Sequence, residues 1–159
     1  MKTSEAEGVV EIERRIAARP ETVFSYFTDP ERFRLWQGFG SEIDPRPGGM
    51  FRVTQTGRTK VVARGEFVEV EPPKRIVFTW GWEQRDGLPE GINGLLPGSS
   101  TVEVELVADG DGTILRLRHS GLPTDASRKV HMVGWDMSLG RLIAAAAGDD
   151  PGPHPLADA

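Results

Sequence analysis

The stretch 124–147, which reads TDASRKVHMVGWDMSLGRLIAAAA, decides the fold that we expect. It contains no proline, its two glycines are isolated, and Thr124 or Asp125 can cap its first turn. At 1.5 Å per residue a helix over this stretch is roughly 36 Å long, enough to cross a small domain. The sequence therefore predicts one long helix near the end of the chain.

Apolar residues lie on two sides of this predicted helix. At about 100° per residue, a broad apolar face is formed by Met132, Trp135, Leu139, Leu142 and Ile143. A second apolar stripe is formed by Val130, Val133 and Met137, with Ala126 and Ala144. Small and polar residues separate the two, namely Ser127, His131, Gly134, Ser138 and Arg141. We expect the broad face to meet the rest of the domain.

The chain before this helix reads mainly as strands joined by tight turns. Two short helices are expected after Pro20 and at 31–36, and strands at 10–18, 38–45, 50–56, 60–70, 75–82, 101–107 and 113–119. Such short connections indicate an antiparallel sheet. The pattern predicts an α+β fold in which a curved sheet of about six to seven strands wraps around the long helix. Where sheet and helix diverge, we expect a cavity.

Length and composition exclude several classes of protein. The 159 residues suit one domain at 9–147, with a flexible N-terminus at 1–8 and a disordered tail at 148–159. The net charge of −5 argues against nucleic-acid binding, and the absence of cysteine excludes disulfides and thiolate metal sites. No signal peptide or membrane span is expected, which favours a cytoplasmic location.

Aromatic residues and two histidines form the candidate ligand-binding set. Ile76, Phe78, Trp80 and Trp82 share one side of their strand, and binding pockets are mostly apolar with a few polar groups. The predicted cavity residues are Trp36, Phe51, Phe78, Trp80, Trp82, His119, His131, Trp135, Ser138 and Leu139. The alternative is that the aromatic rings only fill the core and that the histidines are hydrogen-bonded core residues.

Catalytic and metal-binding motifs are lacking. The sequence contains no glycine-rich phosphate loop, no G-x-S-x-G elbow and no paired-carboxylate signature. A metal site built from His119, His131 and Asp136 is conceivable, but no spacing motif supports it. We therefore expect no catalytic residue, no metal and no cofactor. Arg64 and Glu66 are expected as an exposed pair rather than as a buried pair in the cavity.

The second apolar stripe of the helix needs cover. The Gly/Pro-rich stretch 83–100 has apolar residues at Leu88, Ile92, Leu95 and Leu96, and a loop of this length is often functional. One solution is that this loop packs on the stripe within one chain. The other is a homodimer formed through the helix or through the loop.

Five segments together resemble the helix-grip fold of the START-like (SRPBCC) superfamily. They read IERRIAARPETVFSYFTDPERFRLW, PGGMFRV, GEFVEVEPPKRIVFTW, STVEVELVADGDGTILRLRHSGLP and HMVGWDMSLGRL, and they span roughly residues 9–147. The segments GEFVEVEPPKR and HMVGWDMSLGRL are similar to the branch named for the activator of Hsp90 ATPase (AHSA1-like). This branch is defined by its fold rather than by one activity.

The resemblance implies three kinds of function. The first is binding of a small hydrophobic or aromatic molecule in the cavity, with His119, His131 or Ser138 orienting it. The second is a protein-interaction domain that docks on an Hsp90-type ATPase, with a link to the stress response. The third is a small cyclase or hydrolase, which would need ionisable groups inside the cavity.

Overall fold

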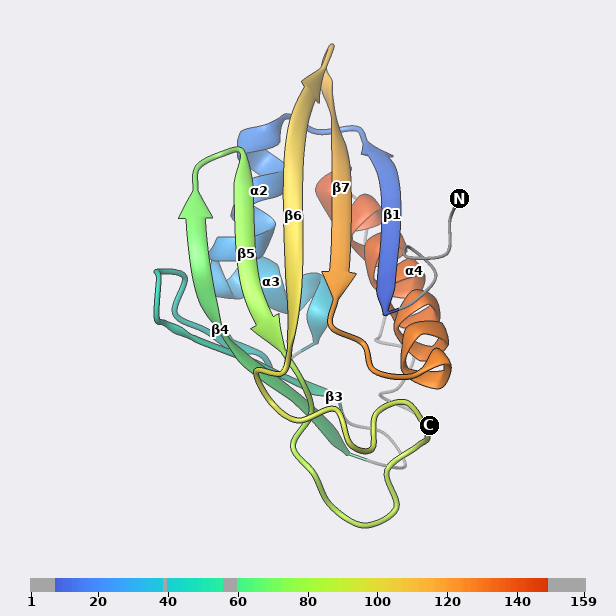
Figure 1. The fold of residues 1–159 in the computed structure, drawn as a ribbon. Helices are drawn as coiled ribbons and strands as arrows, with labels where there is room; N and C mark the ends of the chain where they lie inside the picture. Colours follow the sequence, from blue (N-terminus) through green and yellow to red (C-terminus); the bar gives the residue numbers. More distant parts are fainter. Residues whose placement is uncertain (1–7, 39, 56–59, 149–159) are drawn as a thin grey trace.

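The structure is a computed structural model that describes residues 8–38, 40–55 and 60–148 (Figure 1). Its elements, in chain order, are β1 (Val9–Ile16), α2 (Pro20–Thr28), α3 (Pro30–Gln37), β2 (Glu42–Ile43), β3 (Met50–Gln55), β4 (Val61–Glu71), β5 (Arg75–Trp80), β6 (Ser100–Asp109), β7 (Gly112–Ser120) and α4 (Asp125–Ala146). The connection between the predicted strands at 50–56 and 60–70 and nearly all of both predicted flexible ends lie outside the described residues.

Seven antiparallel strands form the sheet in the order β1-β7-β6-β5-β4-β3-β2. Figure 1 shows all three helices on one face of this curved sheet, with α4 running along it beside β1. Helix α4 makes its closest backbone approaches to β1, α2 and α3. The predicted α+β helix-grip fold is therefore confirmed. No helix in the described part of the chain is long and apolar enough to cross a membrane.

Local sequence explains where the helices begin. The Thr124 hydroxyl accepts a 3.0 Å hydrogen bond from the backbone N–H of Ser127, and the Ser127 hydroxyl accepts one of 3.1 Å from the backbone N–H of Thr124. This reciprocal cap begins α4 at the predicted residue. Asp29 caps α3, because its carboxylate accepts from the backbone N–H of Glu31 at 2.9 Å. Pro30 follows directly and separates α3 from α2.

The buried side of α4 is the predicted broad face shifted toward the polar stripe, with Trp135, Leu139 and Leu142 buried as expected. Met132 and Ile143 are only partly buried, whereas the polar stripe contributes to the core. The buried residues are Ser127, His131, Trp135, Ser138, Leu139, Leu142 and Ala145. The helix is thus rotated toward its small and polar stripe, because the sheet offers hydrogen-bonding partners there. This rotation brings His131 into the interior.

Three side chains anchor the C-terminal half of α4 to the two short helices. The Tyr26 hydroxyl donates to the carbonyl oxygen of Ala145 at 3.0 Å. The Trp36 indole donates to the carbonyl oxygen of Tyr26 at 2.8 Å, and Arg141 donates to the carbonyl oxygen of Trp36 at 3.2 Å. These bonds join α2, α3 and α4 at one corner of the domain.

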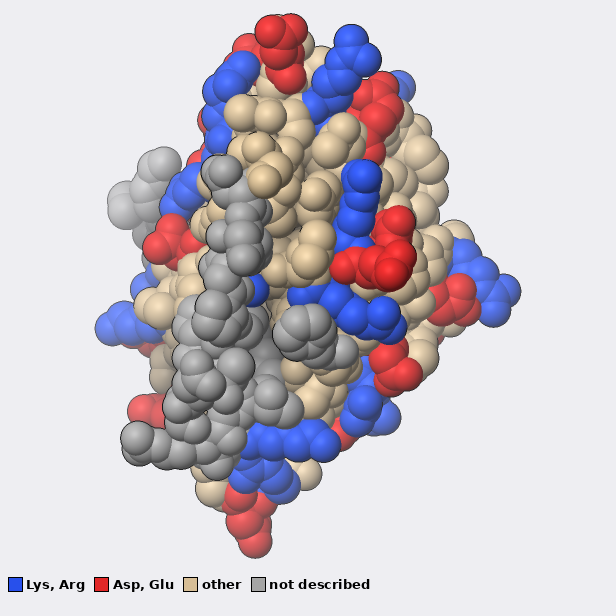
Figure 2. Space-filling view, turned by 180° about the vertical axis from the view of Figure 1, so that it is seen from behind, with Lys and Arg blue, Asp and Glu red and all other residues tan. Residues whose placement is uncertain are grey.

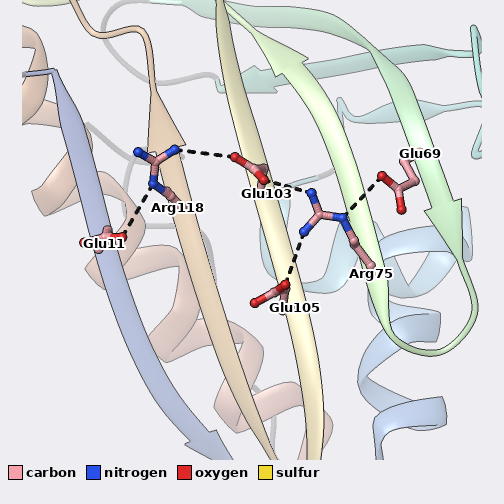
Figure 3. Close-up of polar contacts among 6 residues, drawn as sticks. All are labelled: Glu11, Glu69, Arg75, Glu103, Glu105 and Arg118. Atoms are coloured by element: carbon pink, nitrogen blue, oxygen red, sulfur yellow. Dashed lines mark hydrogen bonds and ion pairs between the residues drawn. The ribbon is translucent and has the colours of Figure 1, made fainter. Parts of the chain in front are cut away.

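Charged side chains cross the sheet on the face turned away from the helices (Figure 3). The Arg75 guanidinium contacts Glu69 at 3.2 Å, Glu103 at 2.8 Å and Glu105 at 3.3 Å. Glu103 also contacts Arg118 at 3.6 Å, which extends this outer-face ladder toward β1. Glu103 and Glu105 therefore point away from the helices.

The predicted pair of Arg64 and Glu66 is exposed, but the two do not bind each other. Arg64 instead contacts Glu83 at 3.4 Å, because Glu83 follows the short bridge between Ala63 and Trp82. Figure 2 shows the helix side of the molecule, where both signs of charge are interspersed over the described residues. The part of that face formed by described residues therefore presents no large patch of one sign.

Candidate ligand-binding site

All ten predicted cavity residues are buried, each at most 5% exposed. The structure brings five of them into one hydrogen-bonded group between the sheet and α4. We call Trp80, Trp82, Trp135, His119 and His131 the Trp–His cluster. Its members come from β5, from the residue pair after β5, from β7 and from α4.

His131 joins helix α4 to the part of the sheet that contains β5. Its Nε2 accepts hydrogen bonds from the indole N–H of Trp80 at 3.2 Å and of Trp82 at 3.0 Å. Its Nδ1 lies 2.7 Å from the carbonyl oxygen of Ser127, one turn earlier on α4. Because a carbonyl only accepts and an indole only donates, the proton of this imidazole is on Nδ1.

His119 has the opposite arrangement. Its Nδ1 accepts from the indole N–H of Trp135 at 3.0 Å, and its Nε2 lies 2.8 Å from the hydroxyl of Ser100. The Ser100 hydroxyl donates to the carbonyl oxygen of Trp80 at 2.7 Å, so it accepts from the imidazole. The proton of His119 is therefore on Nε2, and every polar group in this series of hydrogen bonds has a partner.

Both imidazoles are held in the neutral form. Burial lowers the pKa of His119 well below its ordinary value, and the nearby His131 lowers it further. Burial also lowers the pKa of His131, although the carbonyl of Ser127 opposes that shift. The two ring centroids are 5.0 Å apart, so one imidazolium would disfavour the other.

This geometry leaves neither of the two buried histidines free to act as a general base. His119 donates to Ser100 and so cannot take a proton from that hydroxyl, and the acceptor nitrogen of each imidazole is occupied by indole. Among the described residues, no group of three or more His, Cys, Asp or Glu side chains could hold a metal ion. Asp136 instead contacts Arg14 at 2.7 Å, so it takes no part in a site with the histidines.

The other predicted residues lie around the Trp–His cluster. Phe51 and Phe78 stack with ring centroids 4.2 Å apart, and Phe51 lies 5.6 Å from Trp80. Trp36 is separate from the cluster, because its ring packs edge-on against Phe27 and its indole bonds to α2. Ser138 and Leu139 are buried on the inner side of α4.

The segment 81–99 between β5 and β6 covers the start of α4. Gly91 lies against this helix so closely that a Cβ atom there would be 2.7 Å from the carbonyl oxygen of Ala126 and 2.9 Å from Val130. The loop therefore covers the N-terminal end of the second apolar stripe. Val133, further along the same stripe, is 68% exposed.

Sequence reasoning missed three residues that complete the site. Ser100 has the same inward parity as Val102 and Val104, and Ser127 lies four residues before His131 on the helix, so both had a detectable periodic signal. Gln84 had none. Its side chain binds the carbonyls of Trp82, Ile92 and Leu95 and accepts from the N–H of Gly94, which ties the loop together.

Comparisons with solved structures give similar folds. The chain is 42% identical to an AHSA1-like protein from Rhizobium etli, covering 95% of this chain and 89% of that one with a TM-score of 0.68. It is 31% identical to CalU16 from Micromonospora echinospora, covering 84% and 73% with a TM-score of 0.64. A protein from Mesorhizobium loti shares the fold at 23% identity, 88% and 96% coverage and a TM-score of 0.71.

No curated protein matches the chain. The sequence model of one family, described as activator of Hsp90 ATPase homolog 1-like protein, matches residues 17–147. This range includes every member of the Trp–His cluster and both helices that anchor α4. The chain therefore belongs to the family of activator of Hsp90 ATPase homolog 1-like (AHSA1-like) proteins.

Proposed function

We propose that this domain binds one small, uncharged apolar or aromatic molecule between the sheet and the N-terminal half of α4, against the Trp–His cluster. The observation that carries the proposal is how this space is filled. Helix α4 approaches β1, α2 and α3 most closely, whereas on the β5 side indole and imidazole rings lie between helix and sheet. Rings that occupy such a space can turn aside to admit a flat ligand.

The chemistry of the cluster favours an apolar ligand. Indole and phenyl faces supply large apolar surface, and aromatic rings stack on them favourably. Burying roughly 300 Å² of ligand surface contributes about 7 kcal/mol before the costs of association and rearrangement. After those costs we expect weak binding of a simple probe, with a dissociation constant between about 100 μM and the millimolar range.

The electrostatics of the cluster favour an uncharged ligand. The influences on the two imidazoles are burial, their mutual proximity and the carbonyl of Ser127. An ionised ligand would find no opposite charge there and would lose its hydration. A neutral molecule with one hydrogen-bonding group could instead exchange bonds with an indole N–H or with His131.

A fluorescence and NMR titration with N-phenyl-1-naphthylamine, a neutral apolar probe, tests the proposal. We expect saturable binding at one site per chain, with shifts of the indole N–H resonances of Trp80, Trp82 and Trp135. Trp36 is the internal control, because its indole is bonded to Tyr26 away from the cluster. No binding, or shifts confined to Trp36, would refute the proposal.

Two other functions have less support. Docking on an Hsp90-type ATPase is suggested by the family description alone, and for hydrolysis or cyclisation neither buried histidine is free to act as the base. Retention of the chain in a pull-down with purified Hsp90 would support the docking function. The homodimer and the cytoplasmic location stay predictions.

A further inference from the structure

The two halves of α4 are held by different kinds of contact. The C-terminal half is anchored by Tyr26 and Arg141, which donate to the backbone carbonyls of Ala145 and Trp36. In the middle, Asp136 is tied to Arg14 of β1. The N-terminal half is joined to the β5 side through His131, which alone accepts two indole N–H groups. Toward the β5 side that half therefore depends on this single titratable acceptor, while Trp135 of the same half donates to His119 of β7.

Protonation of His131 would break this junction on one side only. An imidazolium has two N–H donors, and the Nδ1–H would keep its 2.7 Å bond to Ser127 within α4. The new Nε2–H would face the N–H groups of Trp80 and Trp82, so three donors would meet without an acceptor. The imidazole would stay attached to its own helix and lose both bonds to the sheet.

The groups that face His131 do not offset this effect. From β7 the facing titratable group is His119, which would repel a charged neighbour, and Trp80 of β5 does not titrate. After β5, Trp82 faces the imidazole, while the next residue, Glu83, is directed toward Arg52 and Arg64.

On α4 itself, charged side chains near His131 are already paired. Arg128 and Lys129 both bind the carboxylate of Asp125 at 3.1 Å. Burial lowers the pKa of both histidines, and that of His119 more strongly, so His131 is the first of the two to take a proton as the pH falls.

We propose that His131 is a proton-sensitive latch: its protonation releases the N-terminal half of α4 from Trp80 and Trp82 and opens the space beneath the 81–99 segment. The regulatory part of this inference, control of ligand entry, rests on the proposed function. The structural part, acid-induced release of the two indoles, stands without any ligand. At neutral pH the latch is closed, and it opens as the pH falls below the ordinary range of histidine.

Exchange of the indole N–H groups with deuterated water tests the latch directly. Rates are compared with those of free tryptophan at each pH from 8 to 5, which removes the intrinsic pH dependence. Below about pH 6.5, protection of Trp80 and Trp82 should fall by up to about tenfold per pH unit, as expected for one coupled proton. Protection of Trp36 should fall far less, because its bond lies at the anchored corner.

The His131→Gln variant supplies the matched control. The Gln side-chain oxygen can accept from both indoles and does not titrate, so protection of Trp80 and Trp82 should be independent of pH over this range. If that variant does not fold, Trp36 of the natural chain supplies the control: loss of protection confined to Trp80 and Trp82 distinguishes the latch from global unfolding. Equal pH dependence in the Gln variant, or parallel loss at Trp36 through global unfolding, would overturn the latch.

The rate of N-phenyl-1-naphthylamine binding separates the two proposals. If the latch controls entry, the association rate should rise about threefold between pH 7 and pH 6 in the natural chain and stay constant in His131→Gln. Binding with a pH-independent rate and constant indole protection would refute the latch and leave the proposed function intact. Acid-induced release of the indoles without probe binding would support the latch and refute ligand binding.

Discussion

The indole of Trp135 donates a 3.0 Å hydrogen bond to Nδ1 of His119, and this contact places the imidazole proton on the opposite nitrogen. That nitrogen then donates to Ser100, whose hydroxyl donates to a backbone carbonyl of β5. A side chain of the helix is thereby connected through β7 and β6 to β5. Both the stability of the domain and the chemistry of its candidate site depend on these bonds.

Shortening Trp135 should reveal that its hydrogen bond and its ring contribute separately to the free energy of unfolding. Trp135→Phe keeps most of the ring but leaves a buried imidazole nitrogen without a donor, which should reduce the free energy of unfolding by about 1–3 kcal/mol. Trp135→Ala also removes the ring and should cost about 3–5 kcal/mol. Urea unfolding followed by circular dichroism measures both. A Phe variant as stable as the natural chain would mean that the bond to His119 contributes nothing.

Stability should decrease in mild acid. Because the folded protein holds His119 and His131 neutral, the unfolded chain binds more protons below about pH 6.5. The free energy of unfolding should then fall by up to about 1.4 kcal/mol per pH unit for each histidine. The decrease should level off below the lowered pKa of each histidine in the folded protein.

Urea titrations between pH 8 and pH 5 measure this slope. The carboxylate of Asp125, whose pKa is lowered by Lys129 and Arg128, affects stability only at more acidic pH and does not interfere. Constant stability across this range would show that the histidines are not buried as neutral acceptors.

Two glycines of the 81–99 segment form a matched pair for testing whether this segment packs against α4. Gly91 and Gly94 have positive φ angles of 93° and 92°, so alanine strains the backbone equally at both. Only at Gly91 would the added methyl meet the helix, whereas no atom lies within 4 Å of a Cβ at Gly94. Gly91→Ala should therefore lose about 1 kcal/mol more stability than Gly94→Ala. Equal losses in thermal unfolding would show that the loop does not rest on α4.

Arg75 should be the most important residue of the outer-face ladder. It contacts three carboxylates and is itself 29% exposed, so Arg75→Ala removes this partner from Glu69 and Glu105, leaves Glu103 with Arg118, and should cost about 1 kcal/mol. Arg116→Ala is the control, because its guanidinium is 58% exposed and contacts Glu13 alone. Adding 1 M NaCl should reduce the difference between the variants. A difference that salt leaves unchanged would contradict an electrostatic origin.

The arrangement of strands was predictable because alternation is a local property. Val102 and Val104 alternate with Glu103 and Glu105, and one face had to be buried, so their orientation followed from the sequence alone. The partners of Glu103 were not predictable in the same way. Its contacts with Arg75 and Arg118 depend on the register of three strands, which only the folded sheet determines.

The sequence predicted which residues are buried at the candidate site, but it did not predict the hydrogen bonds between them. Trp80 and Trp82 are two residues apart in an aromatic stretch, which predicted that both point into the core, and both are buried. The burial of His131 and Ser138 was predicted, but the partial exposure of Met132 was not, because apolar periodicity favoured the face that contains Met132. That preference was reversed by hydrogen bonds from residues about fifty positions away, which periodicity within one helix cannot detect.

Isotope-edited nuclear Overhauser spectroscopy of the N-phenyl-1-naphthylamine complex tests the central claim most directly. Contacts from the probe to indole protons of Trp80, Trp82 and Trp135 are expected if the ligand lies between the sheet and the first half of α4. Contacts only to exposed apolar residues such as Leu35, Val68 or Val133 would contradict this account, because they would place the probe on the surface.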